Sequence, residues 1–179
     1  MANLFDVADF FIQIANQSED DQMTNLKLNK LLYFAQGAYL ARTGHPLFDT
    51  VFEAWQYGPV VPEIYNKYKS CGKMPIQAND KDFDKSNFSD EEFETLMDTM
   101  REFGKYTGSM LVSLTHKPDT PWSKAREYRL SIISNTDMKE YFTDNPVPYI
   151  GDKINAPKVN KLPSDWYDPE EDSEWEAYL

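Results

Sequence analysis

The chain contains few cysteine, histidine and glycine residues, and these shortages exclude several kinds of site. Cys71 is the only cysteine among 179 residues, so neither an intrachain disulfide nor a Cys-based metal cluster can form. Two histidines, His45 and His116, are too few for a zinc site made of imidazoles, and the carboxylates near them are scattered. No glycine-rich loop of the phosphate-binding kind is present. We therefore expect neither a metal nor a cofactor.

Positive charge is also scarce. Lys and Arg number 18 against 30 Asp and Glu, which gives a formal net charge of -12 and disfavours binding to nucleic acid or to anionic membranes. No apolar run approaches the roughly 20 residues of a membrane span, and Asp6 and Asp9 stand where a secretion signal has basic residues. A lone cysteine suits a reducing compartment. These features predict a cytoplasmic protein.

Apolar residues recur with the 3.6-residue period of amphipathic helices over most of the chain. A broad apolar arc after Thr24 predicts a central helix that ends near Gly44 and Pro46. Alternation over 50–57, before Gly58 and Pro59, predicts a short strand or hairpin. The expected fold class is mainly α, a single compact helical domain. Its other predicted helices are 4–15, 62–70, one from a Ser89–Glu92 capping box to about 103, 109–116, one starting at Thr120-Pro121, and 136–143.

The chain changes character after Asn145, where prolines interrupt any helix. We divide it into a domain at 1–144 and an extended, acidic C-terminal arm at 145–179. Residues 162–179 carry seven acidic residues and no Lys or Arg, which is typical of a solvated terminus. Aromatic side chains among these acids favour a second interpretation, a segment that docks on a basic partner or folds back on its own domain. These aromatics are Trp166, Tyr167, Trp175 and Tyr178.

The block from Ala54 to Pro62 also permits two interpretations. It could be a strand, a tight turn and a helix start whose aromatics pack in the core. Alternatively, its prolines could hold a rigid aromatic surface, and preorganised Trp and Tyr side chains lose little entropy on binding. The candidate partner-binding residues in this block are Trp55, Tyr57, Pro59, Val60 and Pro62. We expect some of Trp55, Tyr57 and Val60 to be partly exposed.

The sequence contexts of the few potentially reactive side chains indicate structural roles. His45 lies in a Gly-His-Pro turn after a helix, and Cys71 lies at a helix end, where the dipole raises a thiol pKa. We expect His116 to cap the preceding helix or to bond buried backbone, and a catalytic His116 is the alternative. The scarcity of potentially catalytic side chains thus disfavours an enzyme.

Four segments in order resemble the SocA-like antitoxin family, also called the Panacea domain, which includes phage-associated proteins. The resemblance covers about residues 5–130 and implies a mainly helical domain that neutralises a toxin by direct contact. The segments are DVADFFI from Asp6, NLKLNKLLYFAQGAYLARTGHPLF from Asn25, FEAWQYGPVVPEIYNKY from Phe52, and LTHKPDTPW from Leu114 with Lys124-Ala125-Arg126 after it.

The sequence as a whole predicts a type II antitoxin that binds a cognate toxin with a basic surface, because an acidic protein is steered towards positive charge. On the arm, Trp166, Tyr167 and Trp175 are the candidate contacts. One alternative is an adaptor that delivers a bound protein to a protease or another machine. The other is a hydrolase or transferase that uses His116.

Overall fold

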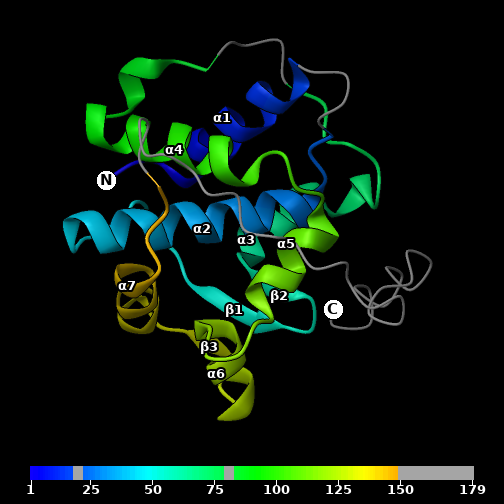
Figure 1. Cartoon of the computed structure of the whole chain (residues 1–179). Coiled ribbons are helices and arrows are strands. Elements are labelled where there is room, and N and C mark those ends of the chain that lie inside the picture. Colours follow the sequence, from blue (N-terminus) through cyan, green and yellow to red (C-terminus); the bar gives the residue numbers. More distant parts are fainter. Residues whose placement is uncertain (18–21, 79–82, 149–179) are drawn as a thin grey trace.

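One central helix organises the molecule. The structure, a computed structural model, describes residues 1–17, 22–78 and 83–148. Helix α2 (Asn25–Thr43) runs through its middle, and the other elements pack around it (Figure 1). These are α1 (Leu4–Asn16), β1 (Phe52–Trp55), β2 (Gly58–Val60), α3 (Pro62–Tyr68), the 3-10 turns η1 (Lys69–Cys71) and η2 (Lys85–Asn87), α4 (Asp90–Phe103), α5 (Gly108–Thr115), α6 (Pro121–Glu127), β3 (Ile132–Ile133) and α7 (Asn135–Asp144).

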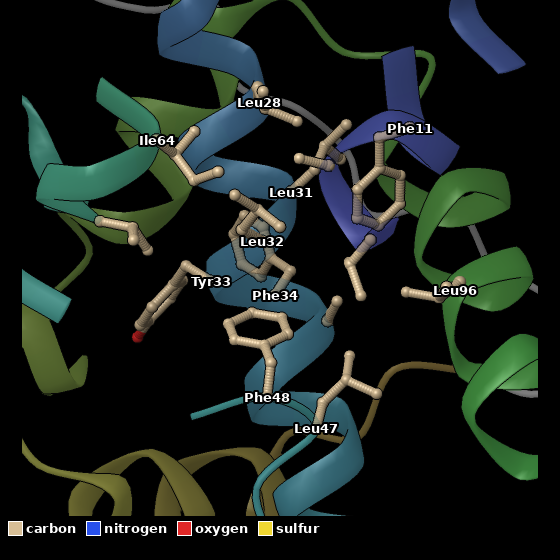
Figure 2. Packing of buried hydrophobic residues seen from close by; sticks show 14 of the residues in the cluster. Phe11, Leu28, Leu31, Leu32, Tyr33, Phe34, Leu47, Phe48, Ile64 and Leu96 are labelled. Carbon is tan, nitrogen blue, oxygen red and sulfur yellow. The ribbon is translucent and has the colours of Figure 1, made fainter. Parts of the chain in front are cut away.

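The apolar arc of α2 makes it the centre of the core. Leu28, Leu31 and Leu32 are fully buried along it, and side chains from the surrounding elements converge on them (Figure 2). They include Phe11 from α1, Ile64 from α3 and Leu96 from α4. Burying such a side chain contributes about 1.5–3 kcal/mol, so α2 supplies a large share of the stability.

Local capping signals placed most helix ends correctly. The Thr24 hydroxyl accepts the Lys27 N–H at the start of α2, and Gly44 ends the helix with a left-handed φ of 79°. Ser89 and Glu92 form the predicted capping box of α4. The mainly helical fold is therefore confirmed, although α3 stops at Tyr68 and continues only as a 3-10 turn.

The predicted strand over 50–57 is part of a hairpin that extends further. Gly58 and Pro59 were expected to end it, and instead they begin β2, which pairs antiparallel with β1. Proline is tolerated there because β2 is an edge strand in the order β2-β1-β3, where a missing N–H breaks no ladder bond. The two-residue strand β3 was not predicted.

The first residues after α7 lie against the domain. Val147 is buried, and its carbonyl oxygen accepts from Arg42 at 3.2 Å. The next carbonyl, that of Pro148, accepts from Arg101 at 2.6 Å. Both guanidinium groups also contact the buried carboxylate of Asp98, each at 2.8 Å. Residues 162–179, with Trp166, Tyr167, Trp175 and Tyr178, lie outside the described residues.

Candidate functional site

The β1–β2 hairpin turns through Gln56 and Tyr57, with Trp55 and Gly58 paired at its end. Neither loop residue has a positive φ, whereas Gly58 has a φ of 102°. A left-handed glycine after a turn is a common way to close a hairpin, because a Cβ is disfavoured in that conformation. The glycine of the Tyr-Gly-Pro sequence is thus required by the local backbone.

Two side chains of α6 hold β1 from outside the sheet. The indole Nε1 of Trp122 donates to the Trp55 carbonyl oxygen at 2.8 Å. The guanidinium of Arg126 donates to the Ala54 carbonyl oxygen at 3.3 Å. Two consecutive carbonyl groups at the end of β1 are therefore satisfied by α6, which fixes the path of the strand into the loop.

His116, which follows α5, holds the loop itself. Its Nε2 lies 3.0 Å from the Gln56 carbonyl oxygen and its Nδ1 lies 2.7 Å from the Val112 carbonyl oxygen. Its ring also packs on Trp122 with centroids 3.6 Å apart. Burial lowers the pKa of the His116 imidazole, although the hydrogen bonds to the two carbonyls act in the opposite direction. The expectation that His116 bonds backbone is confirmed.

Lys30 holds the hairpin from the side of α2. It is fully buried, and its Nζ donates to the Pro59 carbonyl oxygen at 3.0 Å. A Cβ at Gly58 would lie 2.7 Å from the Lys30 Cε and 2.8 Å from the Thr115 hydroxyl, so only glycine allows this approach. Burial lowers the pKa of Lys30 to about 7, because the low dielectric disfavours the ammonium form.

A pair of buried asparagines on α2 fixes the start of α3. The Asn29 Oδ1 accepts the Val61 N–H at 2.9 Å, at a helix start whose own capping residue contributes no side-chain bond. Asn29 in turn donates to the Asn25 side chain, which donates to the Tyr65 carbonyl oxygen. The backbone that follows the hairpin is thereby tied to α2.

These contacts leave the predicted residues of the block with different exposures. Trp55 and Tyr57 are half-buried, which confirms the expectation that part of the block is accessible, and Pro62 is also half-buried. Pro59 and Val60 are buried. Trp55 packs edge-on against Tyr65 at 4.9 Å between centroids. The block therefore combines a buried anchor with two partly exposed aromatics, and its contact with a partner stays a prediction.

The described residues at this site form a rigid surface. Among them, no group of three or more His, Cys, Asp or Glu side chains is placed to hold a metal ion, and no helix is both long and apolar enough to cross a membrane. Cys71 lies apart from the hairpin, at the end of η1. What this arrangement offers is preorganisation, since backbone that is already fixed loses little entropy on binding.

Sequence reasoning missed the residues that build the anchor. Asn29, Lys30 and Arg126 were not singled out, and each contacts backbone that is far away in the sequence. A signal was available, because Asn29 and Lys30 lie within the apolar arc of a helix that was predicted to be central. Polar side chains in such positions must find buried partners.

The comparisons with known proteins match the segments that meet at this site. The family model described as Antitoxin SocA-like, Panacea domain, matches residues 28–123. A protein of Caulobacter vibrioides (strain NA1000 / CB15N), named Antitoxin SocA, is 35% identical over 115 residues. That alignment covers 58% of this chain and 60% of the relative's length. No solved structure matches.

Proposed function

Because the chain belongs to the SocA-like antitoxin family, the Panacea domain family, we propose that it is the antitoxin of a toxin–antitoxin system and neutralises a protein toxin by binding it directly. It acts in the cytoplasm, without catalysis, and covers the surface that the toxin uses. The observation that carries this proposal is the anchored hairpin, which presents Trp55 and Tyr57 on a fixed backbone.

The hairpin has the physical properties of a protein-binding element. Lys30, His116 and Trp122 each hold one of its backbone carbonyl groups, so little order remains to be gained when a partner binds. Tyr and Trp side chains dominate the binding energy of many interfaces. Pro59 and Val60 are buried in the second strand of the hairpin, and Pro62 begins the helix whose Tyr65 packs against Trp55.

A structural role for His116 supports a function without catalysis. Its ring lies between the carbonyl oxygens of Val112 and Gln56, and a neutral imidazole can donate to only one of them. The lowered pKa favours that neutral form. The ring is thus placed between two backbone carbonyls and donates to one of them, which is the role of a positioning residue.

The acidic arm supplies a second part of the proposed contact. Within residues 162–179, carboxylates would steer the chain towards a basic toxin surface, and Trp166, Tyr167 and Trp175 would add contact area. The division into a domain at 1–144 and an arm at 145–179 belongs to this proposal.

Co-expression with the gene next to this one tests the function. We expect the neighbouring product to stop growth alone, and the full-length chain to restore growth and to bind that product in a purified pair. Tyr57→Ala is expected to weaken binding at least about fivefold, whereas Tyr141→Ala, a half-buried tyrosine on α7, leaves it unchanged. Rescue that requires a host protease would show an adaptor instead and contradict direct neutralisation.

A further inference from the structure

Helix α6 and strand β3 lie at the end of the molecule away from α1 and α4 (Figure 1), and four large apolar side chains that adjoin these elements in the sequence or the sheet are exposed. They are Val51 (49% exposed), Tyr128 (69%), Leu130 (53%) and Ile132 (52%), and we call them the α6–β3 patch. Exposed apolar side chains that gather in one place mark contact sites more often than scattered ones do.

Strand pairing places part of this patch at the end of the sheet. Ile132 lies opposite Glu53, so their side chains share a face. Val51 comes directly before β1, and Leu130 comes two residues before β3. The patch therefore lies where β1 and β3 begin their pairing.

The same face reaches the anchored hairpin. Trp55 follows Glu53 by two residues on β1, and its indole Nε1 donates to the Glu53 carboxylate at 2.6 Å. The partly exposed Trp55 thus lies on the face that carries Ile132. A partner that contacts the hairpin has the patch beside it.

The backbone at the edge of the patch has an unusual conformation. After α6, the Leu130 N–H bonds to the Ala125 carbonyl at 2.8 Å, and Arg129 takes a left-handed φ of 56°. Glycine is the usual residue at this position, because a Cβ strains the left-handed conformation. This turn places the exposed Arg129 directly before Leu130, at the edge of the patch.

On the α6 side of the patch the charge differs in sign from that of the whole chain, whereas on the Val51 side Asp49 is exposed. Lys124, Arg126 and Arg129 are exposed beside it, against the single carboxylate of Glu127 on the same segment. Glu53, on the sheet face, is already bonded to Trp55. In a chain with a net charge of -12, the α6 side of this surface attracts acidic groups.

We propose, on the basis of the proposed antitoxin function, that the α6–β3 patch is the docking surface of the folded domain for the toxin. The toxin presents to it apolar side chains flanked by carboxylates, which cover Leu130 and Ile132 and pair with Arg129. This toxin surface is separate from the basic toxin surface that residues 162–179 are proposed to contact.

The test measures the affinity of the full-length chain for the neighbouring gene's product. The double variant Leu130→Thr/Ile132→Thr should weaken binding at least about tenfold, whereas Met74→Ala, which changes an exposed apolar side chain elsewhere, should not. Arg129→Gly should weaken binding at least about fivefold, yet unfold at the wild-type temperature or above it. Asp119→Gly is its control, because Asp119 has a φ of 64° in another turn, and it should keep full affinity.

Each other outcome identifies what has failed. If the wild-type chain does not bind the neighbouring product, the proposed function fails and the inference fails with it. If the wild type binds and the patch variants bind equally well, only the inference fails. If a chain truncated after Leu162 binds the neighbouring product more tightly, and the patch variants then have no further effect on affinity, the patch is the docking site of the chain's own arm. If the chain self-associates in sedimentation experiments and Ile132→Thr abolishes this self-association, the patch binds a second copy of the chain. Either assignment overturns the inference.

Discussion

The amine of Lys30 donates a hydrogen bond to the carbonyl oxygen of Pro59 at 3.0 Å, inside the protein and across 29 residues of sequence. Burying an amine is costly unless it has partners, so a lysine in this position needs a reason. Here it joins the central helix to the hairpin where Gly58 makes room for it. Because burial disfavours the charged form of this amine, the free energy of unfolding should depend on pH.

The first prediction concerns the pH dependence of stability. The pKa of Lys30 is about 7 in the folded protein, against 10.5 for a fully solvated lysine such as that of the unfolded chain. Between these values the unfolded chain binds more protons, so the free energy of unfolding should rise with pH, by on the order of 2 kcal/mol from pH 7 to 9. Lys30→Met should remove this rise. Urea unfolding of both proteins at pH 7, 8 and 9 measures it, and equal slopes would contradict the assignment.

The second prediction concerns Gly58. Gly58→Ala introduces a Cβ at a φ of 102°, where it meets Lys30 and Thr115, so we expect a loss of more than about 2 kcal/mol. Gly44 provides the control, since its φ is also positive, at 79°, in the left-handed helical conformation, and its added Cβ would meet only the Lys139 Nζ, at 3.4 Å. Gly44→Ala should cost about 1 kcal/mol. Equal losses in thermal unfolding would show that close packing at Gly58 is unimportant.

The third prediction concerns the charges that hold Val147 and Pro148. The Asp98 side chain is fully buried against Arg42, whose own side chain is 8% exposed. Asp98→Ala leaves the Arg42 charge buried without this carboxylate and should cost about 3–5 kcal/mol. Arg101→Ala keeps the Arg42–Asp98 pair and should cost much less. Chemical denaturation of the two variants compares them, and similar losses would rule out the buried pair as the main contributor.

The fourth prediction concerns the arm. Ending the chain after Leu162 removes seven acidic residues, so toxin affinity should fall at low salt and depend less on salt concentration. Titrations at low and high salt measure both effects, with growth rescue as a second readout. Unchanged affinity at both salt concentrations, with unchanged rescue, would leave residues 162–179 without a role in neutralisation.

Sequence reasoning succeeded where the determining interactions are local. The caps Thr24 and Ser89 bond within their own first turns, so three or four residues of sequence are sufficient to predict them. Strand β3 and the second half of the hairpin were missed, because their pairing depends on partners brought together by the whole fold.

The site was predicted in part for the same reason. The aromatic block around Trp55 and Tyr57 stands out from composition alone, whereas the fully buried Val60 has the same sequence context as its accessible neighbours. The bond from Lys30 to Pro59 and that from Arg126 to Ala54 require knowledge of which elements are adjacent. Helix periodicity gives the face of a residue but not its distant partner.

The bonds from Arg42 to Val147 and from Arg101 to Pro148 have one more consequence. They fix the position of Val147 and Pro148 on the domain, directly before residues 149–179 in the sequence. A partner already bound to the domain would therefore meet residues 162–179 as a tethered ligand, at an effective concentration that can reach the millimolar range. Even a weak contact by that segment would then lengthen the lifetime of the complex, without any new contact on the domain itself.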